Sequence, residues 1–242
     1  MTFTYLITGA SRGLGLGYTR TLLAAGKHIR VVAAVRDPDS AKQLEPVKQQ
    51  YGERLYVVKC DVTDAASTQT AADELSKSDF AKLDAVIANA GVFGGGWKSS
   101  TQFSEDDLSY NLQSNLFGVV NTVMAFLPLL KQGQGKQIFV TSSLLGSIGG
   151  PLGQTPVSSA YSISKAAVNM YAVKLARELG EEGFTVVPFH PGYVKTDMNA
   201  ANGGGDIEVD EAARLATDNV FLKATKADNA KFMSYDGRTL PW

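Results

Sequence analysis

The feature that most restricts the fold of this chain is an alternation between short, β-branched apolar runs and longer segments of helical character. The apolar runs predict strands at Phe3–Thr8, Ile29–Val35, Leu55–Cys60, Leu83–Ala88, Gln137–Ser142 and Thr185–His190. Strands that alternate with helices form parallel sheets, and such sheets are covered by helices on both faces. The sequence therefore predicts an α/β fold with a doubly wound parallel sheet.

The segments between these runs predict helices at Gly13–Ala25, Asp64–Ser78, Ser104–Leu130 and Tyr161–Leu179. Asp64 and Ser104 stand where a short polar side chain caps a helix N-terminus. Gly180 follows the last helix and favours its termination. Pro188 falls inside the sixth apolar run, where it would remove a backbone donor, so we expect a local bulge there.

Composition restricts the function classes. The chain has 242 residues, 44% of them hydrophobic and 19% charged, with a net charge of −1, which suits one globular domain over residues 1–242. No dense Lys/Arg block indicates nucleic-acid binding, and no apolar run approaches the ~18 residues of a membrane span. A single cysteine, Cys60, forms no internal disulfide, so we expect a reducing, cytoplasmic location. Two scattered histidines and this cysteine lack metal-ligand spacing.

Glycines gather directly after the first strand, in YLITGASRGLGLG at residues 5–17. Glycine costs roughly 0.5–1 kcal/mol relative to alanine in regular structure, so the cluster has a reason. Either the chain turns tightly to pack helix on sheet, or the backbone approaches a ligand closely. A strand, a glycine-rich turn and a helix start together form a phosphate site. The spacing here is G-x-x-x-G-x-G, and the cluster alone leaves both interpretations open.

Further motifs follow in a fixed order along the chain. They are TGxxxGxG at Thr8–Gly15, Asp61-Val62, Asn89-Ala90-Gly91, Asn115, Ser142-Ser143, Tyr161-Ser-Ile-Ser-Lys165, and Pro191-Gly192 with Thr196. In this order they resemble the short-chain dehydrogenase/reductase family over nearly the whole chain. TSSLLGSIGG, an insert before AYSISK and the ending YDGRTLPW resemble, more narrowly, sniffer-type carbonyl reductases and fungal norsolorinic acid ketoreductase-like proteins. The resemblance implies a Rossmann-type sheet of about seven strands and a homo-oligomer, either dimer or tetramer.

Tyr161 and Lys165 are four residues apart on a predicted helix, so their side chains share one face. A neighbouring ammonium favours the phenolate, so we expect the pKa of Tyr161 to fall below its usual ~10. The resemblance then makes Tyr161 the general acid or base and Lys165 its partner. The spacing alone also permits a packed tyrosine and a solvated lysine.

The resemblance supplies two more catalytic residues. Ser143, in an S-x-x-G frame with Gly146, would bind the substrate carbonyl oxygen. The family usually places this serine about a dozen residues before the tyrosine; here the gap is 18, because Gly150–Ser158 appears as an insert. Asn115 would hold a water in a proton relay with the lysine, and Asn111 is the competing candidate.

Cofactor contacts implied by the resemblance are Gly9, Ser11, Arg12, Gly13, Leu14, Gly15, Arg36, Asp61, Val62, Asn89, Ala90, Gly91, Tyr161, Lys165, Pro191, Gly192, Val194 and Thr196. NAD enzymes of this fold carry an acidic residue at the end of the second strand, where this chain has Val35. Arg36 follows, and Arg12 can reach the same region, so two guanidinium groups suit a 2′-phosphate and predict NADP(H). Asp37 could instead pair with Arg36 or cap a helix.

Apolar and aromatic residues around the predicted site are candidates to line the substrate pocket: Phe93, Trp97, Leu144, Leu145, Pro151, Leu152, Tyr193 and Met198. They favour a bulky, apolar carbonyl compound as the small-molecule substrate. We therefore predict an NADPH-dependent carbonyl reductase (EC 1.1.1.-) with Tyr161 as proton donor. The alternatives are an NADP(H)-binding regulatory or sensor protein without turnover, and an alcohol dehydrogenase working in the oxidative direction.

Overall fold

A computed structural model describes residues 2–200 and 204–242. Its sheet has seven strands in the order β3-β2-β1-β4-β5-β6-β7, and every neighbouring pair is parallel. The strands are β1 Phe3–Thr8, β2 Ile29–Val35, β3 Leu55–Lys59, β4 Ala85–Ala88, β5 Gln137–Thr141, β6 Thr185–His190 and β7 Met233–Ser234. The order reverses between β1 and β4, which makes the carboxyl ends of these strands the expected ligand edge. The predicted doubly wound parallel sheet is confirmed.

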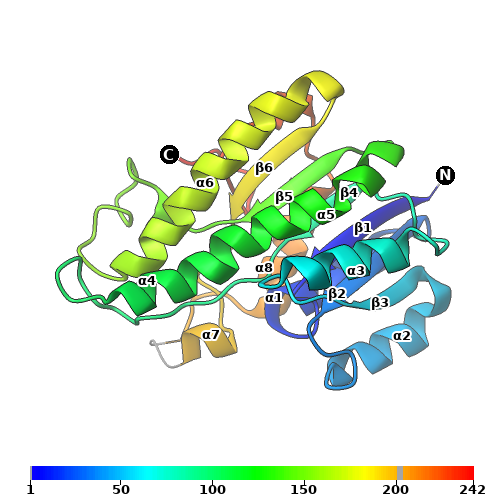
Figure 1. The fold of residues 1–242 in the computed structure, drawn as a ribbon, viewed down its shortest axis with the longest axis horizontal. Coiled ribbons are helices and arrows are strands. Elements are labelled where there is room, and N and C mark those ends of the chain that lie inside the picture. The colour runs from blue at the N-terminus through cyan, green and yellow to red at the C-terminus, as the bar shows by residue number, and fades with distance from the viewer. Residues whose placement is uncertain (1, 201–203) are drawn as a thin grey trace.

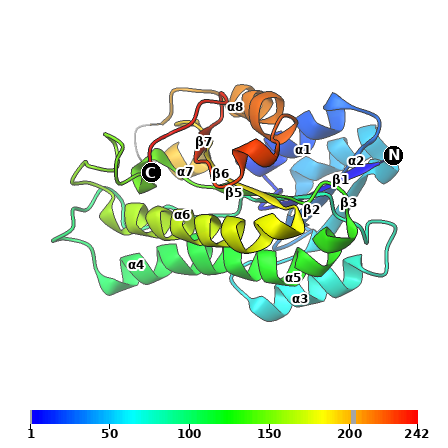
Figure 2. The same ribbon diagram turned by 90° about the horizontal axis from the view of Figure 1, so that it is seen from above.

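Helices cover both faces of the sheet (Figure 1, Figure 2). They are α1 Gly13–Ala25, α2 Glu45–Tyr51, α3 Ala65–Leu75, α4 Glu105–Leu112, α5 Gly118–Gln132, α6 Ser159–Leu179, α7 Asp197–Ala200 and α8 Val209–Ala216. Helices α3, α4, α5 and α6 lie on one face, and α1, α2 and α8 lie on the other (Figure 2). Each face has its own buried apolar cluster, so both sides of each central strand are packed.

Shorter helical turns complete the fold. Tight turns lie at Lys42–Leu44, Gly52–Arg54, Leu144–Gly146, Gly180–Glu182 and Lys226–Asp228, and π-helical turns at Gln113–Phe117 and Thr217–Phe221. The first π turn divides the helix predicted over Ser104–Leu130 into α4 and α5. Helix α6 begins at Ser159, two residues earlier than predicted. The two-residue β7 carries too little pattern to be found in the sequence.

Both predicted helix caps are confirmed. The Asp64 carboxylate accepts a hydrogen bond from Ala66 N at 2.9 Å. Ser104 Oγ accepts from Asp107 N at 3.2 Å, and the Asp107 carboxylate accepts from Ser104 N at 2.9 Å. This reciprocal pair fixes the start of α4, whose next turns carry the asparagines discussed below.

The bulge expected at Pro188 is wrong. Strands β5 and β6 pair residue for residue through Pro188, with no extra residue on either side. Phe189 O faces β5 and accepts from Ser142 N at 2.7 Å, so Pro188, one residue earlier, faces the opposite neighbour. That neighbour, β7, pairs only with Phe189 and His190. The nitrogen of Pro188 therefore lies on the side of β6 where no strand pairs with this residue, so the sheet loses no hydrogen bond there.

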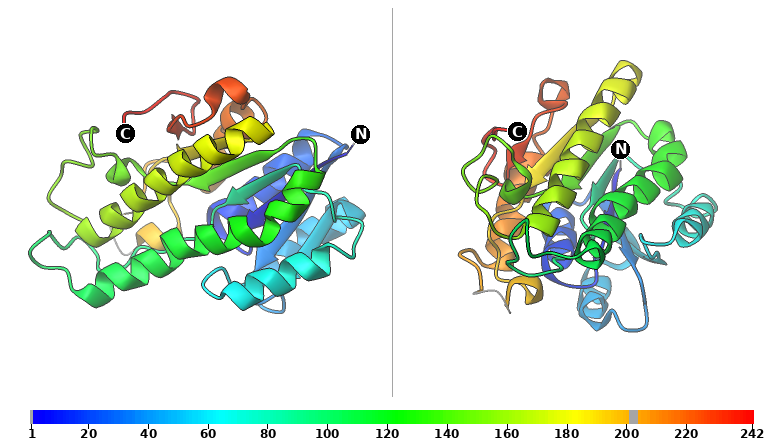
Figure 3. Two further views of the ribbon diagram at one scale, coloured as in Figure 1. Left: turned by 45° about the horizontal axis from the view of Figure 1, so that its top comes forward. Right: turned by 60° about the vertical axis from the view of Figure 1, so that its left-hand side comes forward.

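One continuous helical run, Glu105–Gln132 with 28 residues, is long and apolar enough to cross a membrane by length and composition alone. Half of its most apolar window is buried against the rest of the molecule. Figure 3 shows this run lying beside α6 across one face of the sheet. Helices that pack on a sheet carry such an apolar stripe for that reason.

Candidate active site

The predicted site residues follow the carboxyl ends of successive parallel strands, so the fold brings them to one edge of the sheet. The glycine-rich loop follows β1, Arg36 follows β2, and Asp61-Val62 follows β3. Asn89–Gly91 follows β4, Ser143 follows β5, and Pro191–Thr196 follows β6. Tyr161 and Lys165 reach the same edge from the first turns of α6.

The glycine-rich loop shows the tight packing of helix on sheet that the sequence allows. A Cβ at Gly15 would lie 2.3 Å from Gly9 O, and a Cβ at Gly9 would lie 3.0 Å from Ala90 Cα, so these two glycines allow close packing of α1 on the sheet. Gly13 differs, because it has φ +54° and its nearest outside neighbour would be Thr196 Cγ2 at 3.8 Å. Gly13 is therefore required by its backbone conformation and not by close packing.

The first turn of α1 has no side-chain cap and no acidic residue. Its N–H groups and the positive end of the helix dipole therefore have no side-chain partner at the start of α1, beside Gly13. This arrangement fits the pyrophosphate of a dinucleotide. Thr196, on the loop after β6, is the nearest outside residue to Gly13.

Thr8, at the end of β1, ties the glycine-rich loop to the end of β4. Its Oγ1 accepts from Asn89 N at 3.0 Å and from Ala90 N at 3.1 Å, while Asn89 Nδ2 donates to Thr8 O at 3.0 Å. Sequence reasoning used Thr8 only as part of a motif. A threonine at the end of a strand and directly before a glycine turn was the available sequence signal for this link between β1 and β4.

Ser143 and Tyr161 come close together despite the insert between them, since the Ser143 side chain acts to lower the pKa of Tyr161. Ser142 is directed elsewhere, because its hydroxyl donates to Asn169 Oδ1 in the interior. The insert Gly150–Ser158 forms turns and bends that leave the register of Ser143 intact. Ser143 is therefore the serine that the structure brings to the tyrosine.

Lys165 is buried, and its ammonium Nζ donates to Thr141 O at 2.8 Å. The same Nζ lies 5.6 Å from the centroid of the Tyr161 ring. Burial lowers the pKa of Lys165 from 10.5 to about 8. Thr141 O is a contact that the sequence motifs did not reveal.

The expected fall in the pKa of Tyr161 is not found in the protein alone. Burial raises the pKa of Tyr161 to about 12, and the neighbouring Ser143 side chain offsets only part of this rise. Lys165 contributes little, because its charge is itself desolvated and is bonded to Thr141 O. The spacing prediction overestimated how directly the ammonium acts on the phenol.

Asn115 lies within the π turn Gln113–Phe117, where the helix widens. Its Oδ1 accepts from Val92 N at 2.9 Å, and its Nδ2 donates to Val92 O and to Ser164 Oγ, each at 3.0 Å. A Cβ at Gly91 would lie 2.9 Å from Asn115 Oδ1 and 3.7 Å from Lys165 Nζ. Of the two candidate asparagines, Asn115 is the one next to the lysine, since Asn111 bonds one turn away at Gly94.

At the edge where the sequence predicts the adenosine, Asp61 organises its own turn, because its Oδ1 accepts from Thr63 N at 3.0 Å and from Thr63 Oγ1 at 2.7 Å. Val62 is buried, and its carbonyl accepts from Asn121 Nδ2 at 2.9 Å. Asp37 neither caps a helix nor pairs with Arg36, since its Oδ1 accepts from Asp39 N within the turn after β2.

Arg36 is exposed and takes part in no ion pair within residues 2–200 and 204–242. Arg12 is also exposed, and its Nη1 lies 3.1 Å from the Asp197 carboxylate of α7. This ion pair links the glycine-rich loop with the segment after β6.

The remaining residues that were predicted to contact cofactor or substrate differ in their exposure to solvent. Val194 is buried, while Tyr193 and Met198 are exposed. Leu144 and Leu145 form the tight turn after Ser143. The Phe93 ring centroid lies 4.9 Å from that of Tyr161 and 5.8 Å from that of Trp97. Pro151 and Leu152 are exposed on the insert.

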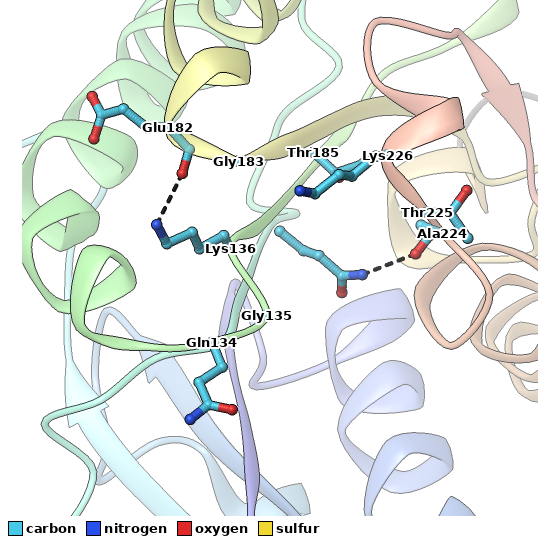
Figure 4. Close-up of a pocket in the computed structure, with 10 residues that line it drawn as sticks. Gln134, Gly135, Lys136, Glu182, Gly183, Thr185, Ala224, Thr225 and Lys226 are labelled. Atoms are coloured by element: carbon cyan, nitrogen blue, oxygen red, sulfur yellow. Dashed lines mark hydrogen bonds between the residues drawn. The ribbon is translucent and has the colours of Figure 1, made fainter.

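A polar cavity of about 440 Å³ lies away from this edge (Figure 4). It is lined by Gln134–Gln137, Glu182, Gly183, Thr185 and Ala224–Lys226, at the amino ends of β5 and β6. Lys136 Nζ donates to Glu182 O at 2.9 Å and Gln137 Nε2 to Ala224 O at 3.1 Å (Figure 4). A second hollow of about 390 Å³ borders Gly13 and Arg20. Among the described residues, no group of three His, Cys, Asp or Glu side chains could hold a metal.

Replacing Lys165 with Met tests the buried ammonium through stability. Between pH 8 and 10.5 the folded wild-type protein binds fewer protons at residue 165 than the unfolded chain does. Its free energy of unfolding therefore rises with pH relative to the variant, by roughly 3 kcal/mol over that range, and the difference is constant below pH 8. Urea unfolding at several pH values measures this difference. Lys174→Met, an exposed lysine on the same helix, should show no such trend, and a flat difference for Lys165→Met would contradict the buried charge.

Comparisons with known proteins agree with this geometry. The short chain dehydrogenase family matches residues 4–205. The short chain dehydrogenase gsfK of Penicillium aethiopicum is 32% identical over 100% of both chains. Among solved structures, the carbonyl reductase Sniffer of D. melanogaster superposes with a TM-score of 0.90 at 27% identity, covering 100% of both chains. An NADPH-bound carbonyl reductase from chicken fatty liver gives a TM-score of 0.88 at 30% identity, covering 100% of this chain and 99% of that one.

The order of the motifs, the sheet topology and these similarities agree over most of the chain. The chain belongs to the short-chain dehydrogenase/reductase family of oxidoreductases, which act on CH–OH and carbonyl groups with NAD(P).

Proposed function

We propose that this protein is an NADPH-dependent carbonyl reductase that converts a bulky, apolar ketone or aldehyde into an alcohol. The observation that carries the proposal is the meeting of Ser143, Tyr161 and a buried Lys165 at one edge of the sheet. Two similar structures, of Sniffer and of the chicken enzyme, are described as carbonyl reductases. The second of these is described as NADPH-bound.

In the proposed mechanism, the Ser143 and Tyr161 hydroxyls hold the substrate carbonyl oxygen between them. Bound NADPH supplies the hydride. Tyr161 gives its proton to the oxygen as negative charge develops there. With a pKa of about 12, the Tyr161 hydroxyl is protonated near neutral pH, which is the form that a proton donor needs.

Lys165 and Asn115 complete the proposed proton path. The Lys165 ammonium, with a pKa of about 8, is largely charged at neutral pH and stands beside the Tyr161 ring. Asn115, on the π turn, lies next to it. We propose that Lys165 returns a proton to Tyr161 after turnover and that Asn115 positions the water that refills Lys165.

Removal of the Tyr161 hydroxyl tests the mechanism. Tyr161→Phe should lower kcat for carbonyl reduction by about 10²- to 10⁴-fold, because the proton donor is lost, while NADPH binding persists. Absorbance of NADPH over a panel of aldehydes, ketones and quinones measures turnover, and cofactor fluorescence measures binding. Tyr171→Phe, on the same helix, should remain active. Full activity of Tyr161→Phe would contradict the mechanism, and binding without oxidation by the wild type across the panel would favour a sensor.

We propose NADP(H) as the physiological cofactor, because Val35 is buried and apolar and two arginines flank the adenosine end. Arg12→Ala and Arg36→Ala should each raise KM for NADPH by about 10-fold or more and change KM for NADH little, because a charged hydrogen bond to the 2′-phosphate is lost. Steady-state kinetics with both cofactors measures this. Arg177→Ala, an exposed arginine on α6, is the control. Equal effects on NADPH and NADH would refute the assignment.

We propose a homo-oligomer, dimer or tetramer, assembled through the outer side of α4, α5 and α6. Tyr110, Phe117 and Met124 are spaced seven residues apart there, as are Ile163 and Met170 on α6, and all are 42% to 64% exposed. Such a stripe on neighbouring helices suits a second copy of the same face.

Sedimentation should give a multiple of 25.8 kDa for the wild type. Met124→Lys and Met170→Lys should shift it toward monomer, whereas Leu222→Lys, an exposed apolar residue elsewhere, should not. A monomeric wild type would contradict the proposal.

A further inference from the structure

Two asparagines, one helical turn apart, hold the chain that leaves β4. Asn115 bonds both backbone groups of Val92, at 2.9 and 3.0 Å. Asn111 does the same one turn earlier, because its Oδ1 accepts from Gly94 N at 3.1 Å and its Nδ2 donates to Gly94 O at 3.0 Å. Both asparagine side chains are completely buried. The residue between the two clamped positions is Phe93.

The spacing of this double clamp has a simple physical basis. Residues i and i+4 of a helix are separated by about 6 Å along its axis. Residues i and i+2 of an extended chain are separated by about 6.6 Å and direct their backbone N–H and C=O groups to the same side. Amides at 111 and 115 therefore match backbone groups at 92 and 94. A Cβ at Gly94 would lie 2.4 Å from Tyr110 Cδ1, so glycine permits this close approach to α4.

The clamp places Phe93 at the catalytic tyrosine. The Phe93 ring lies 4.9 Å from that of Tyr161, tilted by 57°, and 5.8 Å from that of Trp97, tilted by 58°. Phe93 is half-buried and Trp97 is exposed, so this pair of rings, which we call the aromatic wall, faces outward beside Tyr161.

The far end of the same segment is also fixed. Ser159 N, at the start of α6, donates to Lys98 O at 3.1 Å, and Lys98 Nζ forms an ion pair of 2.7 Å with Asp107 of α4. The segment therefore lies against the N-terminal ends of α4 and α6 (Figure 1). The segment that carries Phe93 and Trp97 is thus held at four points, namely Val92, Gly94, the Lys98 carbonyl and the Lys98 ammonium. The position of the two rings is therefore set by the backbone as well as by their own packing.

We propose that Asn111, together with Asn115, positions the aromatic wall, and that this wall selects planar aromatic carbonyl compounds over aliphatic ones of similar size. The inference rests on the proposed reductase function and adds the substrate class. Asn111 is a positioning residue, since it acts through Phe93. Aromatic rings attract one another at centroid distances of 4.5–7 Å in tilted or offset arrangements, beyond the effect of buried area. A substrate ring against Phe93 and Trp97 gains this attraction, and a saturated ring does not.

Acetophenone and cyclohexyl methyl ketone form a suitable probe pair, because they share the carbon skeleton and differ in aromaticity. The wild type should show a kcat/KM for acetophenone about 3- to 10-fold above that for the saturated ketone. Phe93→Leu and Asn111→Leu should bring this ratio close to one, whereas Phe93→Tyr, which retains a ring, should preserve it. Ser109→Ala is the control, because Ser109 lies on the same helix, α4, and is exposed. A ratio near one in the wild type, or a ratio unchanged in Phe93→Leu, overturns the inference.

A binding measurement separates this inference from the proposed function. The protein has two tryptophans, so Trp242→Phe leaves Trp97 as the single emitter. Acetophenone should change Trp97 emission saturably and at lower concentration than cyclohexyl methyl ketone, and Phe93→Leu and Asn111→Leu in this background should remove the difference. If that holds while no carbonyl compound is reduced, the reductase proposal fails and the aromatic site stands. Equal binding of both ketones overturns the site itself, and turnover decides the reductase function independently. Circular dichroism of Asn111→Leu checks its fold, and Phe93→Leu carries the test if that variant does not fold.

Discussion

The buried ammonium of Lys165 is the group on which the arrangement of the site depends. Its hydrogen bond to Thr141 O joins α6 to the end of β5, the strand that delivers Ser143 two residues later. Burial of this charge is unfavourable, as its lowered pKa shows. A single carbonyl partner repays only part of the desolvation cost, so the fold retains a group that opposes its stability. Such a cost is expected where the position of a charge matters for chemistry.

The opposite displacement of the two pKa values follows from the same burial. Desolvation disfavours the charged form of each group, so it raises the pKa of Tyr161 and lowers that of Lys165. The two values therefore move apart, from 10.0 for Tyr161 and 10.5 for Lys165 to about 12 and about 8, so the phenol holds its proton more tightly and the ammonium releases its proton more readily than in water. This order of pKa values favours transfer of a proton from the Lys165 ammonium to a Tyr161 phenolate, which is the direction that the proposed relay uses. The sequence spacing indicates the pair but not the low-dielectric surroundings that govern it.

Much of the fold could be predicted from local pattern, because strands buried on both faces consist of uninterrupted apolar runs. The bounds of β1, β2, β6 and α1 agree with the sequence prediction residue for residue. The exceptions have physical causes. The π turn at Gln113–Phe117 keeps a helical periodicity in sequence, and only its tertiary contacts widen it. Pro188 was misjudged because its tolerance depends on which neighbouring strand its nitrogen faces, and a single sequence does not give that orientation.

The site was predictable to the extent that strand ends converge. Which residues follow each strand could be read directly, and the parallel sheet brings them together. The contacts of each side chain could not be predicted, because the partners are far apart in the sequence. Arg12 and Asp197 are separated by 185 residues, and Thr8 and Asn89 by 81. Asn111 shows the same limit. In the sequence, Asn111 and Asn115 are rival candidates for one role. In the structure both amides bind the chain that follows β4, Asn115 at Val92 and Asn111 at Gly94. An extended segment offers backbone groups on alternate residues, and a helix offers side chains on one face once per turn. The match between these two periods is what fixes Phe93 beside Tyr161.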